Sequence, residues 1–166
     1  QSDVPHRFFF FFYYEKTLAE ANKMVEKHPQ FGYSYMYLYG ANMKLGREKE
    51  AVDAIAKMHI YFGEDEKLVI ERVKASAKGG LKGYWQKCIE QSQTKQLVLR
   101  PEAIDFAMAY QMLGDFDKSF KYLEKSLEER NRWFLEITYD PEWDAIRNDP
   151  RYKELIHKAN LNFTDN

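Results

Sequence analysis

Three glycines recur at a fixed interval along this chain. Gly46, Gly80 and Gly114 are each separated by 34 residues. A leucine precedes two of them, in Leu45-Gly46 and Leu113-Gly114, as expected where a helix ends and glycine takes the left-handed conformation without a Cβ clash. An interval of this length holds two helices and is typical of stacked helix-pair repeats. The spacing therefore predicts an all-α chain built from antiparallel helix pairs.

The side-chain pattern after the last of these glycines supports the prediction. Phe116, Phe120, Leu123 and Leu127 recur at the spacing of one helix face and are expected to be buried. The helix before them carries the small Ala107 where two helices must approach closely.

The predicted pairs form one repeat domain over residues 1–166. In the middle repeat Trp85 stands where a small residue is usual, which predicts different packing there. The parts are a leading half repeat at 1–31, full repeats at 32–64, 65–98 and 99–131, and a helical cap at 132–166.

Two Asp-Pro pairs mark the starts of short helices near the C-terminus. Asp140-Pro141 and Asp149-Pro150 each join a helix N-cap to proline at the first helical position. They predict helices at about 141–147 and 150–159, and the cap role accounts for both aspartates without a catalytic function. Apolar side chains of these helices would cover the open end of the last repeat, which stacked repeats require. They are Trp143, Ile146, Tyr152, Leu155 and Ile156.

One pattern runs through the last repeat and the cap. It reads Ala107-x-x-Tyr110-x-x-Leu113-Gly114-Asp115-x-Asp117-x-Ser119-Phe120, and continues as Asp140-Pro141-x-x-Asp144-x-x-Arg147-x-Asp149-Pro150-Arg151-Tyr152-x-x-Leu155. This pattern resembles the C-terminal end of tetratricopeptide regions in bacterial signalling proteins. The resemblance covers residues 97–161 and implies an α-solenoid that serves interaction or sensing. In those proteins an effector domain precedes the repeats, and this sequence shows no winged-helix, cyclase or phosphate-loop motif.

Composition argues against a general affinity for nucleic acid. Lys and Arg number 25 against 26 Asp and Glu, so the net charge is −1 and no bulk positive field exists. The longest apolar run, residues 8–14, is far shorter than the roughly twenty residues of a membrane-spanning helix. The expected partner is therefore a protein or peptide.

No residues have catalytic or metal-binding spacing. Cys88 is alone, which excludes an internal disulfide and a CxxC motif. The four histidines lack metal-site spacing and provide no base near a Ser or Thr. We therefore expect no enzyme activity, no cofactor and no metal. The histidines are His6, His28, His59 and His157.

The resemblance also implies where a partner would bind. In tetratricopeptide arrays the first helix of each pair lines the concave face. Aromatic and methionine side chains there would give adaptable apolar contact, and lysines of the second repeat would attract a carboxylate or an acidic segment. A merely solvated face is the alternative. The candidate residues are Tyr33, Met36, Tyr37, Lys44, Lys67, Glu71, Lys74, Lys78, Asp105, Met108 and Gln111.

An aromatic run near the N-terminus has two explanations, which are packing on the first repeat and a self-association surface. The sequence predicts an α-solenoid that acts as a non-enzymatic protein- or peptide-binding module, placed by resemblance in a bacterial regulatory or signalling protein. The alternatives are an accessory or sensor region of a larger enzyme or transcription regulator, and a self-assembly module joined through the aromatic run. The run consists of Phe8, Phe9, Phe10, Phe11 and Phe12.

Overall fold

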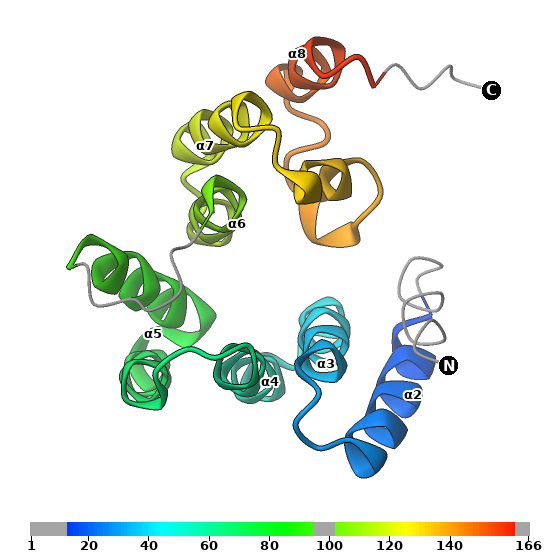
Figure 1. Ribbon diagram of the computed structural model, residues 1–166, viewed down its shortest axis with the longest axis vertical. Coiled ribbons are helices and arrows are strands. Elements are labelled where there is room, and N and C mark those ends of the chain that lie inside the picture. Colours follow the sequence, from blue (N-terminus) through cyan, green and yellow to red (C-terminus); the bar gives the residue numbers. More distant parts are fainter. Residues whose placement is uncertain (1–12, 95–101, 162–166) are drawn as a thin grey trace. The chain divides into compact units, whose positions relative to one another are not determined.

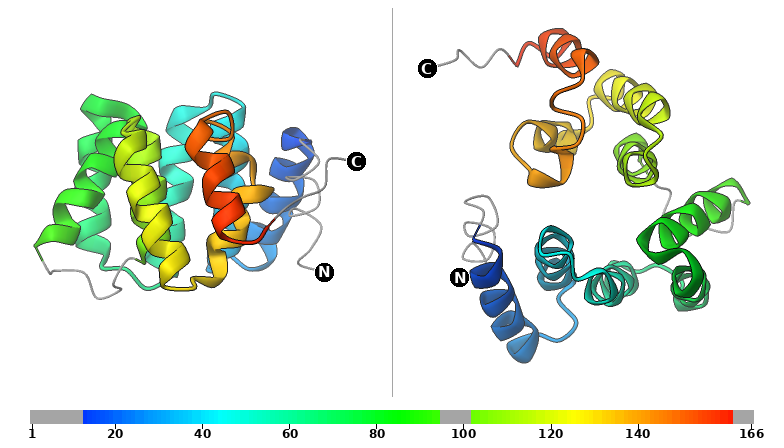
Figure 2. Two further views of the ribbon diagram at one scale, coloured as in Figure 1. Left: turned by 90° about the horizontal axis from the view of Figure 1, so that it is seen from above. Right: turned by 180° about the vertical axis from the view of Figure 1, so that it is seen from behind.

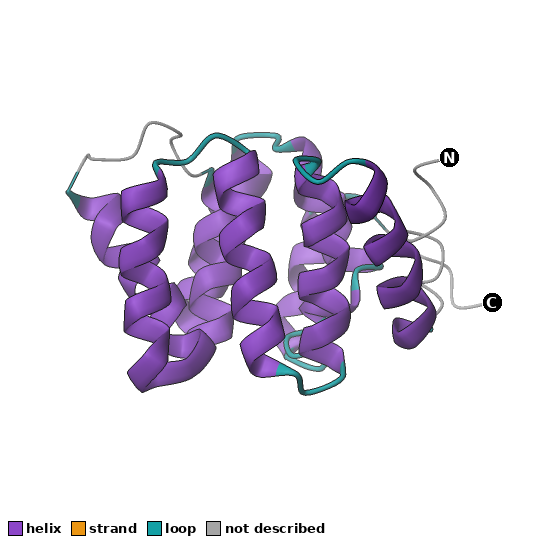
Figure 3. Cartoon of the chain, turned by 90° about the horizontal axis from the view of Figure 1, so that it is seen from below, coloured by secondary structure: helices purple, strands orange, loops and turns teal. Residues whose placement is uncertain are grey.

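The computed structural model describes residues 13–94 and 102–161. The chain divides into two compact units, Gln1–Arg100 and Pro101–Asn166. Every regular element in the described ranges is a helix (Figures 1 and 3). The predicted all-α class is therefore confirmed for this part of the chain. The predicted self-association run, Phe8 to Phe12, lies outside the described residues.

The first unit is a succession of packed helices. Each contacts the next in sequence, α2 on α3, α3 on α4 and α4 on α5 (Figure 2). The elements are α2 (Tyr14–Lys27), α3 (Gly32–Lys44), α4 (Glu48–Tyr61) and α5 (Glu66–Gln93).

Helix α5 is a hairpin of two antiparallel segments that meet at Gly80. Its φ of 58° breaks the helix there, as the glycine spacing predicts. Across the hairpin, the Arg72 Nε donates a hydrogen bond of 2.7 Å to the Gln91 Oε1. A Cβ on Gly83 would lie 2.6 Å from the carbonyl oxygen of Ala75. The segments therefore approach at backbone distance, which a glycine at position 83 permits.

A carboxylate from α4 caps the second segment of α5. The Leu81 N–H donates a hydrogen bond of 2.8 Å to the Glu48 Oε1, and a Cβ on Gly80 would collide with the same oxygen. The Glu48 carboxylate thus satisfies an amide that has no partner within its own helix. A side chain at Gly80 would therefore displace the Glu48 carboxylate from this position.

The second unit begins with an antiparallel pair, α6 (Ala103–Leu113) and α7 (Phe116–Glu128). Gly114 separates them with a φ of 80°, as predicted. The Ser119 hydroxyl donates a hydrogen bond of 2.9 Å to the carbonyl oxygen of the fully buried Ala107. The close approach expected at Ala107 is therefore present.

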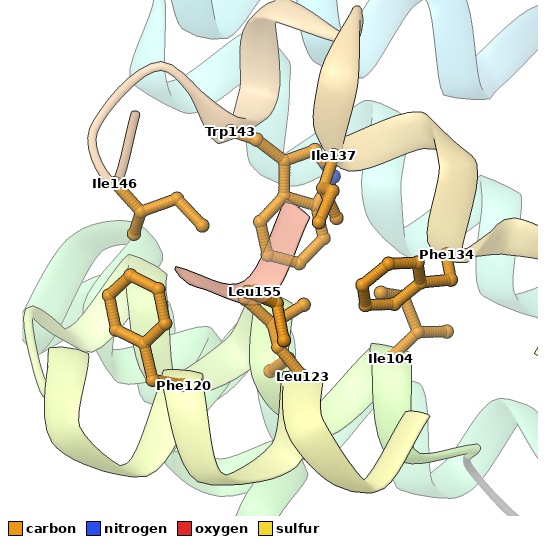
Figure 4. Close-up of a cluster of buried hydrophobic side chains, with 9 residues drawn as sticks. Ile104, Phe120, Leu123, Phe134, Ile137, Trp143, Ile146 and Leu155 are labelled. Carbon is orange, nitrogen blue, oxygen red and sulfur yellow. The ribbon is translucent and has the colours of Figure 1, made fainter. Parts of the chain in front are cut away.

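The C-terminal elements pack on this pair. They are η1 (Arg132–Thr138), η2 (Pro141–Trp143) and α8 (Pro150–Lys158). Trp143, Ile146 and Leu155 are at most 2% exposed and share one core cluster with Phe120 and Leu123 (Figure 4). The predicted covering of this helix pair by the tail is confirmed.

Three details differ from the prediction. The segment η2 is a single 3₁₀ turn rather than a helix through residue 147, and η1 is a 3₁₀ helix that the sequence pattern did not indicate. Phe116, the first residue of α7, is 36% exposed and not buried as predicted. Leu127 is half-buried.

Candidate partner-binding surface

An aromatic patch covers the place where α3 begins and α4 ends. The rings of Phe31 and Tyr33 lie 5.5 Å apart, and those of Tyr33 and Phe62 lie 5.1 Å apart in an edge-on arrangement. All three side chains are between 38% and 41% exposed. Tyr61, 37% exposed, extends the patch through a ring contact of 5.2 Å with Tyr35. We call Phe31, Tyr33, Tyr61 and Phe62 the aromatic patch.

A glycine makes this arrangement possible. Helices α3 and α4 are antiparallel, so the start of α3 lies beside the end of α4. A Cβ on Gly32 would lie 2.6 Å from the Phe62 ring, which shows that this ring lies directly over the first turn of α3. The ring positions follow from packing, and rings fixed in this way lose little freedom when they bind a partner.

Tyr35, which lies beside the patch, is held in place by a hydrogen bond to the backbone. The Tyr35 hydroxyl donates a hydrogen bond of 2.8 Å to the Pro29 carbonyl, and the Lys57 ammonium lies 5.5 Å from the centre of the Tyr35 ring. Burial, with Tyr61 as the second cause, raises the pKa of Tyr35 above its usual value. Tyr35 is therefore a neutral support for the patch and not a charged contact.

A stripe of lysines lies on the first segment of α5. Lys67, Lys74 and Lys78 are exposed, as is Ile70 between them at 43%. The spacing of these residues places them on one face of the helix. Within the described ranges none of the three ammonium groups forms a hydrogen bond or an ion pair. By contrast, Glu71 pairs with Lys87 and accepts a hydrogen bond from Gln91.

The predicted face on α3 is only partly accessible. Tyr33 is exposed, and Met36 and Lys44 are partly so. Tyr37 is only 8% exposed because it packs against the fully buried Ala21 of α2. Tyr33 is therefore the more accessible aromatic side chain on this helix, and the contact role of Tyr37 stays a prediction.

The predicted residues on α6 serve the fold of the second unit. The Asp105 carboxylate accepts a hydrogen bond of 2.7 Å from the Glu102 N–H and so helps to cap α6. The Gln111 amide, 5% exposed, donates a hydrogen bond of 2.7 Å to the Glu142 carbonyl, and Met108 packs on the core cluster. Gln111 therefore links α6 to η2, and its role in partner binding stays a prediction. The sequence pattern missed this link because it did not indicate η1 and η2, which cover this side of α6.

A buried polar cluster joins α4 to α5. Arg72 is fully buried and forms an ion pair of 2.6 Å with Glu64. The His59 Nδ1 lies 2.8 Å from the Tyr84 hydroxyl and 3.0 Å from the Arg72 Nη1. Since both neighbours are donors, this nitrogen is the acceptor of a neutral imidazole.

Burial governs the charge states in this cluster. It lowers the pKa of His59 to about 4, an effect that Glu64 opposes and Arg72 reinforces. Burial also raises the pKa of Tyr84 well above its usual range. Arg72 and Glu64 are held together by their ion pair, and His59 lies against Arg72 and Tyr84, so the geometry fits a packing role for His59. Sequence reasoning missed Arg72, although its position three residues after Val69 already placed it on the buried stripe.

The described residues were also compared with the requirements of a metal site and of a membrane-spanning helix. They contain no group of three or more His, Cys, Asp or Glu side chains that could hold a metal ion. None of the helices described is both long and apolar enough to cross a membrane. Comparison of the chain with protein-family models, with curated protein sequences and with solved structures found no match.

Proposed function

We propose that this chain is a tetratricopeptide-type repeat protein that binds a segment of another protein and catalyses no reaction. The observation that carries the proposal is the aromatic patch, in which four large rings at one end of the α3–α4 pair remain between 37% and 41% exposed. Aromatic side chains dominate the binding energy of protein interfaces. A cluster of them on a rigid helix pair is suited to anchor a partner.

The repeat assignment within this proposal rests on recurrence. Glycines at the interval of 34 residues each have a positive φ, 71° at Gly46, 58° at Gly80 and 80° at Gly114. Each separates two antiparallel helical segments. The resemblance of residues 97–161 to the end of bacterial tetratricopeptide regions adds the expectation of a regulatory or signalling setting.

The lysine stripe gives the proposed partner a charge. Lys67, Lys74 and Lys78 have no partner among the described residues, so an acidic segment could pair with them without breaking existing ion pairs. Exposed charges of this kind contribute more to the rate of encounter than to the final affinity. The aromatic patch and the lysine stripe should therefore have separable kinetic effects.

The test begins with capture of a partner by the tagged chain and continues with association and dissociation kinetics of the purified pair. Tyr33→Ala is expected to speed dissociation by about tenfold or more, because buried aromatic anchors hold a formed complex. The double charge reversal Lys74→Glu with Lys78→Glu is expected to slow association, and the loss should shrink at high salt.

Matched control variants come from the second unit. Tyr139→Ala removes an exposed tyrosine, and Lys121→Glu with Lys153→Glu reverses two exposed charges. These variants should bind like the parent chain. If Tyr33→Ala and the Lys74/Lys78 variant also bind like the parent, the proposed surface is wrong.

A further inference from the structure

A groove crosses the opposite side of α3 from Tyr33. It has a volume of about 380 Å³ and lies between α2 and α4 over α3. Its α3 residues, Tyr35, Leu38 and Asn42, are spaced by three and four and share one helix face. Leu18 and Ala54 complete the apolar lining. The volume is within the usual range for ligand sites of about 300–1,000 Å³.

Asn42 contributes an amide to the lining of this groove. Asn42 is only 7% exposed, yet its side-chain amide forms no hydrogen bond with any described residue. The polar atoms of this amide are not among the fully buried unpaired ones, so they remain accessible from the groove. An asparagine amide presents one acceptor and two donors, so it can pair with the C=O and N–H of a peptide backbone.

The charges on the groove rim are unbalanced. Arg47 already forms an ion pair of 2.8 Å with Glu15, and Lys57 lies over the ring of Tyr35. Glu50 and Asp53, one turn apart on α4, line the groove and form no ion pair with the residues that the structure describes. Lys57 keeps its charge in this position, so one ammonium and two carboxylates remain on the rim without an ion pair, and their sum is negative.

We propose that this groove binds a peptide segment in which a basic residue adjoins an apolar one. The Asn42 amide would pair with the peptide backbone, Leu18, Leu38 and Ala54 would receive the apolar side chain, and Glu50 and Asp53 would pair with the basic side chain. This site lies on the other face of α3 from Tyr33 and takes a ligand of the opposite charge, although Tyr35 lines the groove and also contacts Tyr61 of the aromatic patch. The proposal does not depend on the function proposed above.

The test uses a short acetylated peptide in which lysine alternates with leucine, and a control peptide with glutamate in place of lysine. Titration of the isotope-labelled chain, followed by nuclear magnetic resonance, is expected to shift the Asn42 side-chain amide and the backbone amides of residues 50–57. The glutamate peptide should bind more weakly. Glu50→Gln and Asp53→Asn should each weaken binding of the lysine peptide by roughly twofold to fivefold, the range for exposed ion pairs.

Asn42→Ala separates ligand binding from folding. The Asn42 amide forms no hydrogen bond with a described residue, so its removal should change the melting temperature little, while binding of the lysine peptide weakens. Should this variant fold poorly, the two exposed carboxylate variants still decide the question. Tyr33→Ala should leave peptide binding unchanged.

Several results would overturn the proposal. They are failure of the lysine peptide to bind, equal binding of the glutamate peptide, and binding that both carboxylate variants leave unchanged. Shifts confined to the aromatic patch and lysine stripe would also overturn it while leaving the proposed function intact. Concentration-dependent shifts at Asn42 without peptide would assign the groove to a second copy of this chain.

Discussion

Two separate features of the structure favour glycine at position 80, namely its backbone angles and the space beside its Cα atom. Its φ of 58° and ψ of −150° fall in a region that only glycine commonly occupies, and a Cβ would collide with the Glu48 carboxylate. Gly46, with φ of 71°, has open space around the Cβ position. We expect Gly80→Ala to lower the free energy of unfolding by about 2–4 kcal/mol and Gly46→Ala by about 1 kcal/mol. Urea unfolding of both variants measures the difference, and equal losses would contradict the role of Glu48.

His59 predicts a dependence of stability on pH. Its pKa in the folded chain, about 4, lies below the usual 6.5, so the unfolded chain binds the proton first as pH falls. This contribution is fully present above pH 6.5 and is lost as the pH falls towards 4, to a total of about 3 kcal/mol. Chemical unfolding of the parent and of His59→Gln across this range measures it. We expect the stability of the variant to vary less with pH.

Glu136 changes the stability with pH in the opposite direction to His59. The effect of His59 is therefore measured as the difference between the parent chain and His59→Gln. Burial, reinforced by Asp140, raises the pKa of Glu136 to about 7. Its stabilising contribution is present below pH 4.5 and is lost as the pH rises to 7. Because this carboxyl is the same in both chains, the difference between parent and His59→Gln isolates the imidazole. A parallel pair of pH curves would show that His59 titrates normally.

At the scale of elements, the C-terminal segments cover apolar side chains of α6 and α7. Trp143, Ile146 and Leu155 close the core cluster around Leu123 (Figure 4). Deleting residues 140–166 should therefore expose this cluster and cause aggregation or a large loss of stability. Size-exclusion chromatography and thermal melting of the shortened chain give the measurement. A monomer with an unchanged melting temperature would rule out the covering role.

Helices that begin or end at a strong local signal could be predicted from the sequence, and elements that lack such a signal could not. Glycine at Gly46 and Gly114 and the Asp149-Pro150 pair each act locally, so the sequence alone indicates where α3, α6 and α8 end or begin. The segment η1 has no glycine or periodic stripe, and it is held by the burial of Phe134 and Ile137 in a core assembled from other elements. The accessibility of Tyr37 and Gln111 depended on such distant packing. For the same reason, the candidate surface could be predicted only in part.

At the scale of the whole molecule, each compact unit has its own buried side chains. Leu123 is fully buried and belongs to the core cluster of the second unit. Leu123→Ala should cost about 2–5 kcal/mol. If the two units unfold independently, hydrogen exchange should quicken in residues 102–161 and stay unchanged in residues 13–94. Faster exchange throughout would instead indicate one continuous repeat array.

The bond from the Leu81 N–H to the Glu48 carboxylate also bears on the order in which the first unit folds. It joins residues 33 positions apart, so it can form only after α4 has docked beside the hairpin. Contacts that close long loops tend to form after local helical ones. Glu48→Gln should then speed unfolding with little effect on the refolding rate, as expected for an interaction absent from the transition state. Stopped-flow measurements in urea would place this cap early or late in folding.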